Sequence, residues 1–130
     1  MPSIDTNILI RYLVRDDESQ FRKVIELLKE YQESTLTINI PVIMESCWVL
    51  RSTYNYSKNE LIETYRLLLK TKGLNIQSNK TVELALDEYE KSNADFEDCL
   101  IAVVNEISNQ VPTFTFDKKA SKLKRMKLLK

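Results

Sequence analysis

The side chains of this sequence that could do chemistry are carboxylates set in apolar surroundings. Asp98 follows Asp95 by three residues and is itself followed by the uncharged segment Cys99 to Val104. On a helix this spacing places both carboxylates on one face. No Lys or Arg lies within the next four residues to pair with Asp98, and a carboxylate entering a buried stripe is costly unless it is paired or binds a ligand. We therefore expect Asp98 to have a partner from elsewhere in the chain or a bound ion.

Three more acids stand in comparable places. Glu45 is the only charged residue between Ile40 and Leu50, and Asp5 and Asp117 each stand at the C-terminal end of a predicted strand. If these carboxylates share one cleft, their charges raise each other's pKa, and a divalent cation removes that repulsion. The sequence has no His, so any metal site must use oxygen ligands, which favour Mg²⁺ or Mn²⁺. Such a cation can activate water and orient a phosphodiester for in-line attack.

Each acid also has a purely structural interpretation. Asp5 could cap the first helix, Glu45 could extend to solvent from a half-exposed helix, and Asp98 could be a surface acid. Asp117 could be a turn or N-cap residue, and Asp95 could be an N-cap or first-turn acid, with a supporting role at a metal site second.

The elements that would position these acids alternate between short strands and helices. A strand is expected to end near Asp5, before a helix capped by Thr6 or Asn7, and Ser57 with Glu60 forms a capping-box pattern. Gly73 is expected to stop the preceding helix. The expected strands are 3–5, 35–40, 74–77, 112–116 and 126–129, and the expected helices are 6–14, 16–31, 41–53, 57–70, 79–91, 95–108 and 118–125.

This order of elements is typical of an α/β fold with a parallel sheet and helices on both faces. In such sheets the functional site lies beyond the C-terminal ends of the strands. The length of 130 residues and the hydrophobic fraction of 43% suit a single domain over residues 1–130. The net charge is zero, and there is neither a signal-peptide pattern nor a membrane-spanning run, which favours a cytoplasmic protein. Cys47 and Cys99 are expected to be buried thiols.

Taken in order, the acidic segments resemble a known family. The segments are Ile4-Asp5-Thr6-Asn7-Ile8-Leu9-Ile10-Arg11-Tyr12-Leu13, Glu45 with Trp48-Val49-Leu50, Ala94-Asp95-Phe96-Glu97-Asp98-Cys99-Leu100-Ile101, and Thr115-Phe116-Asp117. They resemble a PIN domain, and most of all the VapC-type toxins of bacterial type II toxin–antitoxin pairs. The resemblance covers nearly the whole chain.

This resemblance implies a three-layer α/β/α sandwich with a central parallel sheet and a Mg²⁺- or Mn²⁺-dependent endoribonuclease. It also implies a homodimer held by a small antitoxin protein. By position in the motifs, Asp5, Glu45 and Asp98 would be the core metal ligands, and Asp117 would be a fourth acid. Asn7 would orient Asp5, although it could also be an ordinary first-turn residue.

Basic residues supply two candidate RNA contacts. The C-terminal tail has no acid and could hold RNA phosphates, or it could be a solvated face. Arg11 and Arg15 are the second candidate, with the same alternative. The basic residues of the tail are Lys118, Lys119, Lys122, Lys124, Arg125, Lys127 and Lys130.

Two other functions compete with the nuclease. A phospho-accepting receiver domain has a similar size and an acidic Mg²⁺ pocket, but it needs a phosphorylatable Asp after its third strand. No Asp lies within or just after Leu74 to Gln77. A catalytically silent module with a PIN-like fold that only binds protein or RNA is the other alternative, and the presence of all four acids argues against it.

Overall fold

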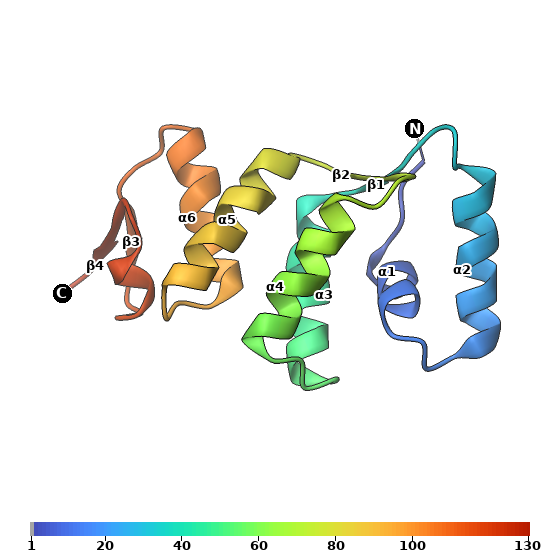
Figure 1. Ribbon diagram of the computed structural model, residues 1–130. Coiled ribbons are helices and arrows are strands. Elements are labelled where there is room, and N and C mark those ends of the chain that lie inside the picture. The colour runs from blue at the N-terminus through green and yellow to red at the C-terminus, as the bar shows by residue number, and fades with distance from the viewer. Residues whose placement is uncertain (1) are drawn as a thin grey trace. The chain divides into compact units, whose positions relative to one another are not determined.

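A computed structural model describes residues 2–130. The chain divides into two compact units, residues 1–78 (the N-terminal unit) and residues 79–130 (the C-terminal unit) (Figure 1). It is a mixed α/β structure in which every paired strand is parallel. The predicted α/β class with parallel strands is therefore confirmed, although among residues 2–130 the strands pair as two two-stranded sheets and not as one central sheet. No helix among residues 2–130 has both the length and the apolar composition that a membrane span needs.

The N-terminal unit is built on a short parallel sheet. Strands β1 (Leu36–Ile38) and β2 (Leu74–Ile76) pair in register, with Leu36 opposite Leu74 and Ile38 opposite Ile76. The chain around Ser3 adds an isolated parallel bridge to Thr37. The strand expected at residues 3–5 is therefore reduced to this bridge. In both strands the first and third residues are buried and the middle one is more exposed, which matches side chains that alternate between the two faces of a sheet.

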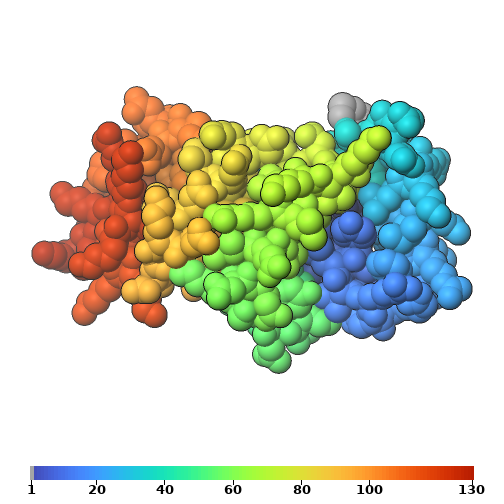
Figure 2. Space-filling view, in the orientation of Figure 1, coloured from blue at the N-terminus to red at the C-terminus, as the bar shows by residue number. Residues whose placement is uncertain are grey.

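Four helices complete this unit: α1 (Thr6–Leu13), α2 (Glu18–Glu30), α3 (Ile40–Ser52) and α4 (Lys58–Leu69). Helix α1 packs against both α2 and α3, and in the space-filling view the dark blue atoms of α1 meet the lighter blue atoms of α2 (Figure 2). The capping box at Ser57 and Glu60 is present as predicted, with hydrogen bonds in both directions. Gly73 lies beyond the helix end, in the turn before β2, with φ of 90°.

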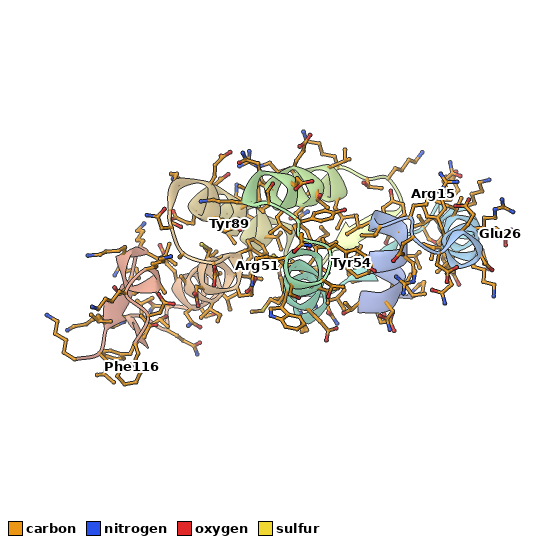
Figure 3. The ribbon with its side chains drawn as sticks, turned by 90° about the horizontal axis from the view of Figure 1, so that it is seen from below. Arg15, Glu26, Arg51, Tyr54, Tyr89 and Phe116 are labelled. Atoms are coloured by element: carbon orange, nitrogen blue, oxygen red, sulfur yellow. The ribbon has the colours of Figure 1, made fainter. Side chains whose placement is uncertain are left out.

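The C-terminal unit pairs helix α5 (Asn79–Lys91) with α6 (Phe96–Ile107). Tyr89, labelled in Figure 3, packs its ring against Phe96 at a centroid distance of 5.7 Å. Asn109 ends the turn after α6 with φ of 57°, a left-handed conformation that Asn tolerates better than most residues. Strands β3 (Thr113–Thr115) and β4 (Met126–Leu128) then form a second parallel pair.

The basic helix expected over residues 118–125 is not formed. Between β3 and β4 the chain makes only the 3₁₀ turn η1 (Ala120–Lys122). Leu123 already has extended backbone, and Arg125 takes φ of 64° before β4 begins. The crossover back to a parallel strand leaves too few residues for a regular helix, and neighbouring lysines repel each other on a short helix.

Candidate functional site

Asp5 caps helix α1. Its Oδ1 accepts a hydrogen bond from the backbone N–H of Ile8 at 3.0 Å, and its own backbone is extended. The expectation that Thr6 or Asn7 caps this helix was wrong, because Thr6 is already the first helical residue and is buried. Among residues 2–130, no group donates to the second carboxylate oxygen of Asp5. The capping bond therefore leaves one oxygen of Asp5 available to a ligand.

Asn7 lies in the first turn of α1 and is exposed. Asp5 and Asn7 both line a cleft of about 440 Å³, whose other residues come from α1 and from α2. We call this the α1–α2 cleft. It is lined by Asp5, Asn7, Ile8, Arg11, Gln20, Lys23, Val24 and Leu27.

Glu45 is exposed on α3, while the two residues after it are fully buried. The hydroxyl of Ser46 donates to the carbonyl oxygen of Ile43 at 2.9 Å and lies 2.6 Å from the hydroxyl of Tyr65 on α4. This buried pair fixes α3 against α4. Glu45 is therefore carried by a helix that is held in place at the next residue.

Asp98 lies in the first turn of α6 and is partly buried. Burial raises the pKa of its carboxyl group, and the negative charges of Asp117, Asp95 and Glu97 raise it further. The sequence indicated that this carboxylate enters an apolar helix face and needs a partner. Among residues 2–130 the charges that act on it come from other acids, and no Lys or Arg forms an ion pair with it.

Asp117 lies two residues after the end of β3, and its Oδ1 accepts a hydrogen bond from the backbone N–H of Ala120 at 3.0 Å. Asp95 is the N-cap residue of α6, but its side chain makes no capping hydrogen bond. Asp95 and Asp117 line one shallow pocket of about 440 Å³ together with Lys118 and Lys119. The C-terminal unit thus gathers Asp95, Asp98 and Asp117 around one region.

The acids predicted to form one site therefore fall into two sets. The N-terminal unit carries Asp5, Asn7 and Glu45, and the C-terminal unit carries Asp95, Asp98 and Asp117. Within residues 2–130, neither unit by itself arranges three or more His, Cys, Asp or Glu side chains in a group that could hold a metal ion.

The two arginines considered as RNA contacts have different surroundings. Arg15, labelled in Figure 3, donates two hydrogen bonds to Glu18 and lies over the ring of Phe21 at 4.4 Å. Arg11 instead lines the α1–α2 cleft, where Gln20 accepts from its Nε at 2.6 Å. A hydrogen bond to Tyr54 raises the pKa of Arg11, and the charge of Asp16 raises it further.

Sequence reasoning did not single out Gln20, Lys23 or Tyr54. Gln20 and Lys23 are three residues apart on α2, which is the spacing of one helix face, but only the packing of α2 on α1 brings them to Asp5. Tyr54 lies beyond the end of α3 and reaches Asp16 at 2.8 Å.

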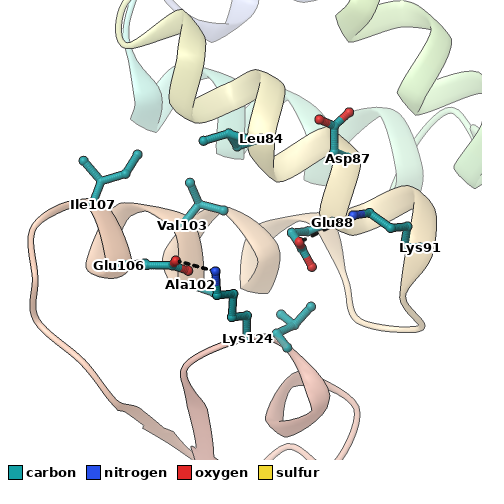
Figure 4. A pocket seen from close by; sticks show the side chains of 10 residues that line it. Leu84, Asp87, Glu88, Lys91, Ala102, Val103, Glu106, Ile107 and Lys124 are labelled. Atoms are coloured by element: carbon teal, nitrogen blue, oxygen red, sulfur yellow. Dashed lines mark ion pairs between the residues drawn. The ribbon is translucent and has the colours of Figure 1, made fainter.

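A second pocket of the C-terminal unit, of about 340 Å³, is lined by α5, α6 and the segment before β4, and it contains none of the predicted metal-site residues (Figure 4). Leu84, Val103 and Ile107 give it an apolar lining. Its charged rim is paired: Lys124 lies 3.3 Å from Glu106, and Lys91 lies 3.9 Å from Glu88. Lys124 of the basic tail is therefore engaged with an acid of α6.

Comparison with known proteins assigns the family. No curated protein matches the sequence as a relative. The family model described as the PIN domain matches residues 3–126, so it spans both units and every predicted site residue. The chain belongs to the PIN domain family.

Proposed function

We propose that this PIN domain is a metal-dependent endoribonuclease in which Asp5, Glu45, Asp98 and Asp117 hold Mg²⁺ or Mn²⁺. PIN domains are in general nucleases, so membership supports the broad activity. The observation that carries the proposal further is the placement of a partly buried Asp98 beside Asp117 and Asp95. Acids near a helix start favour the helix dipole, but like charges around a partly buried Asp98 also oppose its ionisation.

The residues present fit a hard divalent cation. Every predicted ligand is a carboxylate, the donor type that Mg²⁺ and Mn²⁺ prefer. The like charges around Asp98 oppose its ionisation, and a bound cation would reverse that opposition. When bound, the cation supplies Lewis acidity toward the scissile phosphate and toward the attacking water.

The chain's own groups hold the carboxylates in place. Backbone N–H groups fix one oxygen of Asp5 and one oxygen of Asp117, and the other oxygen of each accepts no hydrogen bond among residues 2–130. Capping and ligand binding are therefore compatible roles for both residues. Asn7, beside Asp5 in the cleft, and Asp95, beside Asp117, are assigned supporting roles.

We extend the proposal to the biological role on the resemblance of the acidic segments. The chain would act as a single PIN domain over residues 1–130, as the toxin of a bacterial toxin–antitoxin pair in the cytoplasm. Its partners would be an RNA substrate, a small antitoxin protein and a second copy in a homodimer. The basic residues Lys118 and Lys119 beside Asp117 support the RNA substrate, because lysines near a cleavage site attract phosphates.

The experiment that tests the activity is cleavage of total cellular RNA by the purified chain with Mn²⁺, Mg²⁺ or a chelator. Asp98→Asn is the inactivating variant. Glu97→Gln is its matched control, because this substitution also removes one negative charge, at the position just before Asp98. We expect discrete fragments from the wild type and from Glu97→Gln, and none from Asp98→Asn or with chelator. Cleavage by Asp98→Asn at the wild-type rate would overturn the assignment.

A further inference from the structure

The α1–α2 cleft combines a predicted metal ligand with two cations. Asp5 and Asn7 line one part of it, and Arg11, Gln20 and Lys23 are the other polar residues of a lining that also includes three apolar side chains. Its volume of about 440 Å³ is open to solvent, and all of these residues belong to the N-terminal unit. The cleft therefore offers positive charge next to a residue at which we place the cleavage chemistry.

The guanidinium of Arg11 is held in a fixed orientation. Its Nε donates to Gln20, and its Nη1 lies 3.2 Å from Asp16 and 3.4 Å from Tyr54. Tyr54 in turn donates to the other oxygen of Asp16 at 2.8 Å. Among residues 2–130 no acceptor takes the N–H groups of Nη2, so this end of the guanidinium can donate to a ligand.

Lys23 supplies a second, unengaged cation. It is exposed on α2, lines the cleft, and makes no ion pair with any residue of the described chain. Arg15 lies outside the cleft, pairs with Glu18 and is covered on one side by Phe21, whereas Arg11, although paired with Asp16 at 3.2 Å, lines the cleft. Of the basic residues around α1 and the start of α2, Arg11 and Lys23 are thus the pair that the fold presents to a ligand at Asp5.

Resting on the proposed ribonuclease function, we propose that the α1–α2 cleft binds the RNA phosphate that neighbours the scissile one. Lys23 and the outer nitrogen of Arg11 contact this phosphate, and Gln20 positions Arg11. Arg and Lys are the usual partners of nucleic-acid phosphates, and such contacts set the register of the strand without reading its sequence. The cleft would thus place the neighbouring linkage at Asp5.

Lys23→Gln tests this subsite, because an exposed residue without partners can be replaced without disturbing the fold. Lys29→Gln is the matched control, with the same charge change on the same helix outside the cleft. Lys23→Arg should restore binding. Affinity for a fluorescent single-stranded oligouridylate is measured over a range of salt concentrations in the Asp98→Asn background, which separates binding from cleavage.

We expect Lys23→Gln to weaken binding about two- to fivefold and to reduce the slope of log affinity against log salt by about 0.7, the value for one phosphate contact on a single strand. Lys29→Gln should leave the slope unchanged. Equal slopes and affinities for the two variants would overturn the subsite, and so would the absence of any RNA binding.

Cleavage assays distinguish this proposal from the broader one. If the wild type cleaves RNA but Lys23→Gln and Lys29→Gln have equal KM and kcat, the nuclease assignment stands and the subsite is wrong. If Lys23 contributes to RNA binding but the wild type never cleaves, the nuclease assignment is wrong, and so is the placement of this phosphate beside a scissile one. With both correct, Lys23→Gln should raise KM more than it lowers kcat.

Discussion

The buried hydroxyl pair between α3 and α4 gives a prediction whose size follows from the contacts. Ser46 and Tyr65 are both 0% exposed, and their hydroxyl oxygens are 2.6 Å apart. Because Ser46 donates to the carbonyl of Ile43, Tyr65 is the donor between the two hydroxyls. Removing the hydroxyl of Ser46 should therefore change the stability by a different amount than removing the hydroxyl of Tyr65.

Ser46→Ala should be the more costly change. It removes two hydrogen bonds, the one that Ser46 donates to Ile43 and the one that it shares with Tyr65, and at about 0.5–1.5 kcal/mol each the loss is about 1–3 kcal/mol. Tyr65→Phe leaves Ser46 its bond to Ile43 and should cost about 0.5–1.5 kcal/mol. The double variant should cost less than the sum of the two, because both single variants lose the same bond between Ser46 and Tyr65.

Urea unfolding followed by circular dichroism measures these costs. Unfolding entropy scales with length, so for 130 residues 1 kcal/mol corresponds to about 4 °C in Tm. Ser52→Ala is the matched control, because its exposed hydroxyl bonds only the carbonyl of Trp48 in the same helix, and we expect little loss. Strictly additive costs, or a larger loss for Tyr65→Phe than for Ser46→Ala, would refute the reasoning.

Three further predictions concern charge, metal and capping. Asp98→Asn should stabilise the metal-free protein at pH 7 but not below about pH 3. The pKa of Asp98 is raised in the folded state, so ionisation of this carboxyl destabilises the fold, and the penalty develops as the pH rises above the unfolded pKa of about 3.9. Urea unfolding at a series of pH values measures this difference. Mn²⁺ at about 100 times its Kd should raise the wild-type Tm by about 10 °C in thermal unfolding, and chelator or Asp98→Asn should abolish the rise. Ser57→Ala should cost about 1 kcal/mol in urea unfolding at pH 7, because it removes the N-cap bond to Glu60, and an unchanged midpoint would contradict the cap.

Much of the local structure could be predicted from the sequence because its causes are local. Ser57 and Glu60 form their capping box within four residues, and the alternation in β1 and β2 follows from one buried face. The failures have local causes as well. Asp5 outcompetes Thr6 as the cap because its carboxylate reaches the N–H of Ile8, and Asp117 binds Ala120 where a longer basic helix was expected.

The chemistry of the candidate site could be predicted only in part. The sequence indicated which acids stand in apolar surroundings, and Asp98 with its raised pKa agrees with that reasoning. The sequence alone did not show which of Arg11 and Arg15 is the better candidate for an RNA contact. Their environments differ because of where Glu18, Gln20 and Tyr54 lie in the folded chain. Contacts between helices distant in sequence are not encoded in any single segment.

The reactivity of the two buried cysteines can report local opening of the protein. Cys47 on α3 belongs to the N-terminal unit, Cys99 on α6 belongs to the C-terminal unit, and both are 0% exposed. A thiol reagent can reach each of them only when its own helix opens. Pulsed alkylation followed by peptide mass spectrometry would therefore measure the opening of each half of the chain separately, without any engineered label.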